Sequence, residues 1–164
     1  MDKKQLSVIE LVGGMTLLLL GRKLEGLLIF GKGVYDLEKI YKAEHPELEP
    51  GFDKRWEKAI EFYEDTHKDK TNRVLHMVGI PLILGGAIGL LANKPYKSKW
   101  LFSGGLFAFG WLLNIIGHSR YEKNKPAFFD DPLSFVAGPV WDIKQLINNQ
   151  KNKNEEIILE HSNN

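Results

Sequence analysis

The chain has 164 residues, a usual length for one compact domain, with 22 lysine and arginine residues against 21 aspartate and glutamate residues. A formal charge of +1 gives no electrostatic case for a nucleic-acid-binding protein, so we expect no nucleic-acid partner. The sequence contains no cysteine, which excludes disulfides, thiolate nucleophiles and cysteine-ligated metals. Any metal must therefore be held by nitrogen and oxygen donors.

Residues 1–50 are predicted to form an apolar or amphipathic helical extension. Residues 6–20 are apolar but are interrupted by Glu10, too short to span a bilayer comfortably, and without the cleavage site of a signal peptide. Residues 24–41 then carry apolar side chains at roughly helical spacing, which indicates either an interfacial helix or a helix packed against the rest. Prolines and a glycine near residue 50 mark a boundary, and 53–66 follows as a charged helix.

Two long uncharged segments dominate the middle of the chain. The 17 residues of 77–93 and the 18 residues of 100–117 contain no ionisable side chain. As helices over about 74–92 and 100–118, each would be ~27 to 28 Å long, enough to cross a hydrocarbon core of roughly 30 Å. The short connection between them predicts an antiparallel transmembrane hairpin. Gly85-xxx-Gly89 and Gly104-xxx-Ala108 have the small-xxx-small spacing that brings membrane helices together.

The basic residues that flank this hairpin predict its orientation. Nine lysines and arginines lie in the two long flanks, and three, Lys94, Lys97 and Lys99, lie in the turn. The positive-inside rule therefore places the turn outside and both flanks in the cytoplasm. After the hairpin, a further membrane-associated helix is predicted at about 132–146, and the polar residues 148–164 are predicted to form a disordered tail. The expected fold is an all-α, multi-pass helical membrane bundle, with 51–147 as its core.

Three of the five histidines are predicted to meet at one end of the hairpin. His76 enters the first segment and His118 leaves the second, so an antiparallel arrangement brings them to the same depth, and His67 lies on the same side. Asn72 is four residues from His76, and Glu122 is four from His118, so each pair can share a helix face. His45 and His161 lie in a loop and in the tail, where surface positions are expected.

Three imidazoles with a nearby carboxylate suit Fe(II), zinc or manganese, and a site at a membrane boundary favours a lipid-like substrate. The spacing His-x8-His is not a motif in itself, so the residues leave three alternatives open. The first is an iron-dependent lipid oxygenase. The second is a non-catalytic membrane module whose histidines form only hydrogen bonds, and the third is a zinc-dependent lipid hydrolase with a metal-bound water.

Two separated blocks resemble a known family. The first has the order Tyr63-xxx-His67-xxxx-Asn72-Arg73-xx-His76-xx-Gly79-Ile80-Pro81. The second is Gly117-His118-xxx-Glu122-Lys123-xx-Pro126-Ala127, followed by Gly138-Pro139. From about Trp56 to Leu146 the chain resembles the 2-hydroxy fatty acid dioxygenases of fungal α-oxidation and their bacterial relatives, which are small multi-pass membrane proteins. Lys70 stands where that family usually has proline, and Asp130-Asp131-Pro132 stands where it has an acidic residue and an asparagine.

The resemblance implies an Fe(2+)-dependent dioxygenase that uses O2 to shorten a long-chain 2-hydroxy fatty acid by one carbon. It implies that His67, His76 and His118 hold the metal and that Glu122 and Asn72 are the accompanying catalytic residues. It also implies a multi-pass protein of a bacterial inner membrane, whose metal site lies on the cytoplasmic side and whose partners are the fatty acid, O2 and the lipid bilayer. Nothing in the sequence indicates the oligomeric state.

Overall fold

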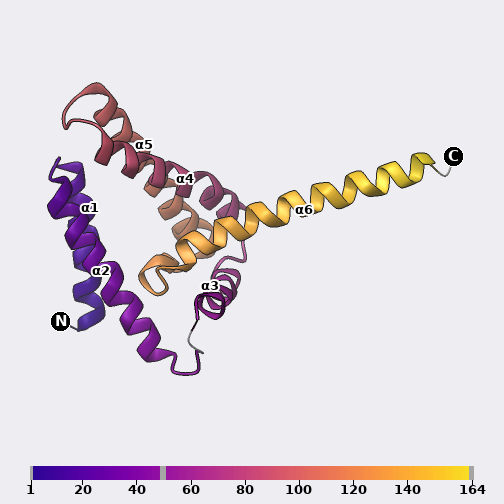
Figure 1. Cartoon of the computed structure of the whole chain (residues 1–164), viewed down its shortest axis with the longest axis horizontal. Coiled ribbons are helices and arrows are strands. Elements are labelled where there is room, and N and C mark those ends of the chain that lie inside the picture. The colour runs from indigo at the N-terminus through magenta and orange to yellow at the C-terminus, as the bar shows by residue number, and fades with distance from the viewer. Residues whose placement is uncertain (1, 49–50, 163–164) are drawn as a thin grey trace.

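The computed structural model describes residues 2–48 and 51–162, with the backbone alone at 149 and 152–162. Those residues form helices and connecting loops, with no strand among them, so the predicted all-α class is confirmed. The elements in chain order are α1 (Lys3–Leu19), α2 (Lys23–Glu44), α3 (Phe52–Thr66), α4 (Lys70–Ala92), α5 (Ser98–Ile116), η1 (Gly117–Glu122), η2 (Ala127–Phe129) and α6 (Ser134–Ser162). Figure 1 shows two helical hairpins, α1–α2 and α4–α5, with α3 and α6 closing one end of the bundle.

The central hairpin forms where the sequence predicts it, with α4 and α5 packed antiparallel. Three glycines allow the two backbones to approach closely. A Cβ on Gly79 would lie 3.0 Å from the carbonyl oxygen of Gly110, and a Cβ on Gly86 would lie 2.6 Å from the backbone nitrogen of Phe107. The predicted contact through Gly85 is wrong, because a Cβ there would meet nothing within 4 Å. The glycines of α4 that lie close to α5 are Gly79, Gly86 and the other predicted glycine, Gly89, where a Cβ would overlap the Ser103 side chain.

Helices α1 and α2 form a second hairpin, in which they pack together through Gly14, Gly26 and Gly33. Of the two alternatives for 24–41, the structure favours packing against the rest of the chain. Phe30 and Val34 of α2 pack against the cluster of Leu11, Leu37 and Phe128, and Met15 and Leu18 of α1 pack against the core cluster of Ile83, Leu90, Trp100 and Phe107. At the turn between α1 and α2, Lys23 Nζ donates to the carbonyl oxygens of Leu91 and Asn93, which satisfies acceptors that the end of α4 leaves free.

Ion pairs made by Arg55 and Arg73 fix α3 and α6 around the end of the central hairpin. The Arg55 guanidinium donates to the carboxylates of Glu38 and Asp131, which joins α2 and α3 to the loop before α6. Asp131 is fully buried and also accepts from the backbone nitrogens that begin α6. Towards the other end of α3, Asp142 accepts from Arg73 of α4 and from Tyr63 of α3. These contacts hold three helix ends in one place.

The C-terminal tail differs from the prediction. Residues 148–162, predicted to be disordered, continue α6 as helix through Ser162, and Figure 1 shows this part extending away from the hairpins. The segment after Pro139 contains neither glycine nor proline and is rich in lysine, glutamine, glutamate and leucine, which favour helix. The absence of glycine and proline lets the helix continue through the four asparagines of 148–154, although asparagine has a low helix propensity.

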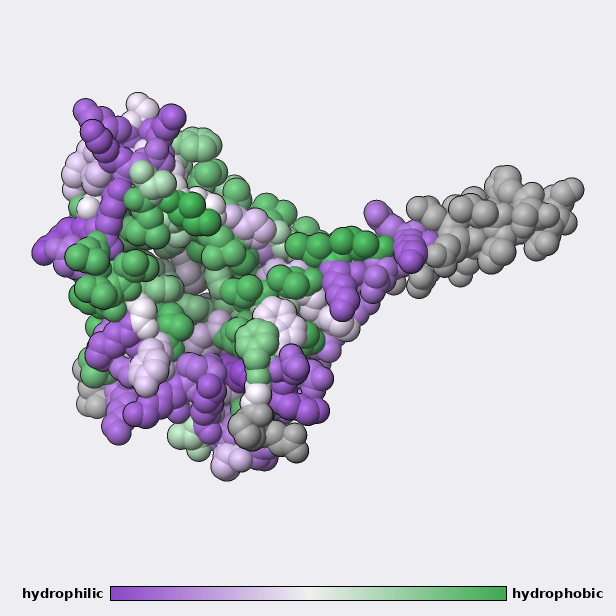
Figure 2. All heavy atoms as spheres, in the orientation of Figure 1, coloured by the Kyte–Doolittle hydropathy of each residue, from purple (hydrophilic) through white to green (hydrophobic). Residues whose placement is uncertain are grey.

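Two helical segments, Lys70–Ala92 and Ser98–Glu122, are long and apolar enough to cross a membrane. Large apolar side chains on their outer faces are exposed, among them Ile88 (67%) and Phe102 (69%). Figure 2 shows hydrophobic residues gathered across the middle of the molecule, with hydrophilic residues towards its two ends. An apolar belt of this kind is typical of a surface that contacts lipid.

Candidate metal centre

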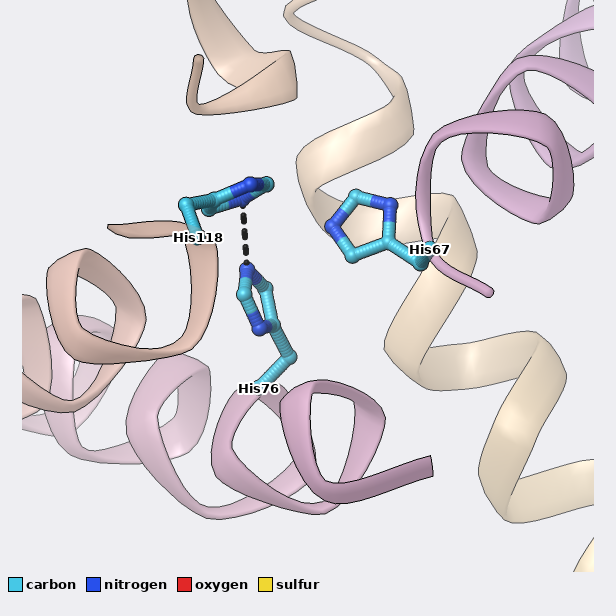
Figure 3. A group of neighbouring side chains, drawn as sticks. All are labelled: His67, His76 and His118. Atoms are coloured by element: carbon cyan, nitrogen blue, oxygen red, sulfur yellow. Dashed lines mark hydrogen bonds between the residues drawn. The ribbon is translucent and has the colours of Figure 1, made fainter. Parts of the chain in front are cut away.

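Three histidines from three different elements lie together at one end of the central hairpin. His67 follows the last residue of α3, His76 lies in the second turn of α4, and His118 lies in η1. Figure 3 shows the three rings turned towards one another. Their ring centroids are 4.7 to 4.9 Å apart, and one potential ligand nitrogen from each lies within 4.8 Å of the others. All three side chains are buried, with 2 to 4% exposed.

The Nδ1 atom of each ring is turned outward and bound to an oxygen acceptor. His67 Nδ1 donates to the Tyr63 carbonyl at 3.0 Å, and His76 Nδ1 donates to the Asn72 carbonyl at 2.9 Å. His118 Nδ1 lies 2.7 Å from Asn124 Oδ1. Because Asn124 Nδ2 donates to the Thr66 carbonyl, its Oδ1 must be the acceptor for His118. Each Nδ1 therefore carries the proton, and each Nε2 of a neutral ring has a free lone pair.

The inward Nε2 atoms lack suitable partners within the described part of the chain. His67 Nε2 is buried without a hydrogen bond. His76 Nε2 and His118 Nε2 face each other at 3.1 Å, although both neutral rings already have their proton on Nδ1. Two opposed lone pairs at this distance repel unless a cation or proton lies between them. The donor set therefore fits a metal ion, with each ligand ring oriented by a hydrogen bond on its far side, as is usual for metal-binding histidines.

The environment of His67 keeps its ring uncharged. Burial, together with the positive charges that His76 and His118 can carry, lowers the pKa of His67 to about 3. The ring is consequently neutral near pH 7, which is the state that binds a metal. The cavity beside the three rings has a volume of about 20 Å³, enough for one water-sized guest. Its walls are mainly aromatic and apolar side chains, including Trp111, Phe128 and Phe135.

Asn72, predicted as a catalytic residue, lies beside this centre. Its backbone orients His76, and its side chain is fully buried with neither amide atom hydrogen-bonded to any described residue. A Cβ on Gly117 would overlap the Asn72 amide, so glycine is required where α5 passes into η1. A buried amide with unused hydrogen-bonding capacity is costly in a structural role and suited to binding a polar group.

Glu122, the other predicted catalytic residue, is not among the three grouped side chains. Its carboxylate accepts a hydrogen bond from the Asp69 backbone nitrogen at 2.7 Å and so holds the loop between His67 and α4. The prediction placed Glu122 on the same helix face as His118 through α-helical spacing. Residues 117–122 form a π-helical turn, and the Glu122 carboxylate at its end is engaged by the Asp69 backbone.

Two further polar residues belong to the site and were not predicted. Asn124 orients His118, as described above. Asn114 lines the small cavity, is 3% exposed, and has an amide oxygen without a hydrogen bond to any described residue. A sequence signal for Asn114 exists, because it is the one amide within the uncharged segment 100–117 and precedes His118 by one helical turn.

Tyr63 joins the metal centre to the surrounding scaffold. Its ring stacks on the His67 ring with centroids 4.0 Å apart, and its hydroxyl donates to Asp142 at 2.8 Å. Gly138 of α6 lies against the same ring so closely that any Cβ there would overlap it. The position of His67, which follows the last helical residue of α3, is thus fixed by packing from α6.

Fold and site together define an all-helical protein with a buried three-histidine centre at the end of two long apolar helices. The chain belongs to the Mpo1-like family, described as "2-hydroxy-palmitic acid dioxygenase Mpo1-like", whose model matches residues 54–150. The match includes the three histidines and the helices that carry them, and it excludes the α1–α2 hairpin. Comparisons with curated proteins and with solved structures gave no match. The predicted family is confirmed.

Proposed function

We propose that this protein is an Fe(II)-dependent dioxygenase that shortens long-chain 2-hydroxy fatty acids by one carbon. The observation that carries the proposal is the set of three Nε2 lone pairs directed at one buried point, in a chain that belongs to a family described by this activity. Bound iron would supply the activation of O2 and the redox chemistry. The chain's own residues would bind the metal and the substrate and hold them in position.

His67, His76 and His118 would hold the ion through Nε2, with Tyr63, Asn72 and Asn124 fixing the ring orientations. We assign the unpaired Asn72 amide to the polar head of the substrate, because it is the buried polar group next to His76 and Gly117. Glu122 supports the site by holding the Asp69 backbone, which sets the distance between His67 and His76. The aromatic walls exclude bulk water from the reacting atoms.

We further propose that the protein is a multi-pass membrane protein of a bacterial inner membrane, with the metal centre on the cytoplasmic side. The exposed apolar faces of α4 and α5 support the membrane location. His76 near the start of α4 and His118 after α5 lie at the same end of the hairpin, which is the end flanked by most of the basic residues. A fatty acid could then leave its chain in an apolar environment while its head reaches the metal.

Oxygen consumption by the purified protein tests the activity. The protein in detergent, loaded anaerobically with Fe(II), should consume O2 when 2-hydroxypalmitate is added and should release an acid one carbon shorter. Palmitate, which lacks the 2-hydroxyl, is the control substrate and should be inert. A folded, iron-loaded protein that consumes no O2 and forms no shorter acid would contradict the proposal.

The donor set also supports a second candidate, a zinc-dependent lipid hydrolase, because three histidine nitrogens with an open position are a known catalytic zinc arrangement. This alternative predicts zinc in the purified protein and product formation that is independent of O2. A third outcome, a protein that retains no metal while losing thermal stability on His76→Ala, would favour a non-catalytic membrane module.

A further inference from the structure

A second cavity lies between the two helical hairpins. Its volume is about 110 Å³, and residues from α1, α2, α4 and α5 line it, among them Met15, Leu18, Phe30, Ala87, Leu91 and Phe107. Its other lining residues are glycines and a leucine, so no hydrogen-bonding side chain faces it. An apolar cavity of similar size, ~150 Å³, stays dry and binds benzene. The chemistry of this space therefore suits a hydrocarbon segment.

Helical register places this cavity on the same side of the central hairpin as the metal centre. On α4, Ile80 lines the small cavity at the histidines, and Ala87, seven residues later, lines the second one. On α5, Phe107 lines the second cavity, and Trp111, four residues later, lines the first. Residues separated by four or seven positions share a helix face, so the two cavities lie along one line. From His76 to Leu91 that line is ~22 Å long at the helical rise.

Aromatic side chains separate the two cavities. The Trp111 ring lies 6.5 Å from the Phe107 ring and 6.0 Å from the Phe128 ring, and Phe128 in turn lies 6.4 Å from Phe30. Trp111 and Phe135 are only partly buried and pack against both apolar clusters of the molecule. Trp111 lines the first cavity and Phe107 lines the second, so rotation of these two rings is the movement that would join the two spaces.

We infer that the space between the hairpins is the binding site for the acyl chain of the substrate, whose polar head lies at the three histidines. The inference rests on the proposed function for the identity of the head group. The α1–α2 hairpin, which lies outside the family match, then supplies one wall of the site through Met15, Leu18 and Phe30. The distance from His76 to the far end of the second cavity makes long chains better ligands than short ones, because each additional buried methylene adds ~0.8 kcal/mol.

Filling the second cavity tests this inference. Ala87→Phe introduces a ring into the cavity, and Ile88→Phe is the matched control on the adjacent residue, whose side chain is 67% exposed on the outer face. The measurement is equilibrium binding of 2-hydroxypalmitate and of 2-hydroxyoctanoate to the parent and both variants in detergent. Ala87→Phe should weaken binding of the long acid by about tenfold, equivalent to the loss of about two buried methylenes, and leave the short acid unchanged. Ile88→Phe should change neither.

Photo-crosslinking of the parent protein supplies a second readout that does not depend on any variant. A 2-hydroxypalmitate analogue with a diazirine at the chain end should label residues of the second cavity, such as Leu18, Leu91 or Phe107. Labelling confined to lipid-facing residues such as Ile88 or Phe102, or equal binding of the long acid by parent and Ala87→Phe, would overturn the inference. If a membrane lipid occupies the cavity instead, the diazirine analogue would not label the cavity residues, and excess 2-hydroxypalmitate would not displace that lipid. That result would also overturn the inference.

These results separate the two proposals. If the parent consumes O2 with 2-hydroxypalmitate, but Ala87→Phe binds the long and the short acid as the parent does, the proposed acyl-chain site is wrong and the proposed activity stands. If the chain end labels the second cavity while no turnover occurs, the acyl site stands and the dioxygenase activity is wrong.

Discussion

At the residue scale, the metal centre depends on which nitrogen of each imidazole carries the proton. The three Nδ1 atoms are all bound to oxygens, two of them carbonyls of the residue four positions earlier in the chain. The sequence predicts that these three histidines converge, because an antiparallel hairpin with equal arms brings His76 and His118 to one depth. It does not predict the tautomers, because those depend on the conformations of Tyr63, Asn72 and Asn124 after folding.

The role of Asn124 in orienting His118 leads to a specific prediction. Asn124→Leu removes the acceptor at His118 Nδ1, so the ring can rotate or carry its proton on Nε2, and we expect metal affinity to fall about 10- to 100-fold. The measurement is metal affinity by chelator competition. Lys125→Gln, at the exposed neighbouring position, is the control and should bind as the parent does. An Asn124→Leu protein with parental affinity would show that this hydrogen bond does not orient a ligand.

At the element scale, the distance between α4 and α5 decides whether His76, on α4, and His118, which follows α5, come together. The glycine spacing in the sequence predicts that the two helices pack closely, but it selects Gly85 where the structure has Gly86. Residues four apart and residues seven apart can both share a helix face, so spacing alone does not decide between these two glycines. The structure resolves this ambiguity because only one of the two neighbours faces the partner helix. Likewise, the π-helical turn at 117–122 has no local sequence signature, so the contact of Glu122 with the Asp69 backbone could not be predicted.

Adjacent glycines provide a matched test of this packing. In Gly86→Ala the new methyl would lie 2.6 Å from the Phe107 backbone nitrogen, so the helices must separate, and we expect a loss of about 1–3 kcal/mol. In Gly85→Ala the methyl meets nothing within 4 Å, so stability should be unchanged or slightly higher. Thermal unfolding in detergent measures both, and equal midpoints for the two variants would contradict the observed helix interface.

At the scale of the whole molecule, apolar residues lie between two hydrophilic ends (Figure 2). His76, near the start of α4, and His118, after α5, lie at one end of the central hairpin. Hydropathy predicts the central hairpin well because it acts over long, uniform segments, whereas the orientation expected from the flanking charges stays a prediction. The N-terminal hairpin is harder to predict, since residues 6–20 and 24–41 are each compatible with several environments and only their packing against each other and the rest of the chain decides between them.

The natural absence of cysteine makes the orientation directly measurable. Lys97→Cys lies in the turn between α4 and α5, and Lys68→Cys lies in the loop after His67. In intact cells, a membrane-impermeant maleimide should label Lys97→Cys at once and Lys68→Cys only after the membrane is permeabilised, because the basic flanks are expected to stay inside. The opposite pattern would place the histidines on the outer side, and labelling of both without permeabilisation would argue against a membrane-spanning hairpin.

The most direct measurement for the whole account is the metal content of the purified, intact protein. Elemental analysis of the parent should find close to one iron per chain, His76→Ala should lose it, and His45→Ala, which changes a histidine outside the cluster, should retain it. A folded parent protein that neither carries nor takes up any metal, or a His76→Ala protein that holds as much iron as the parent, would contradict the claim that these three rings form a metal centre; zinc in place of iron would contradict the dioxygenase.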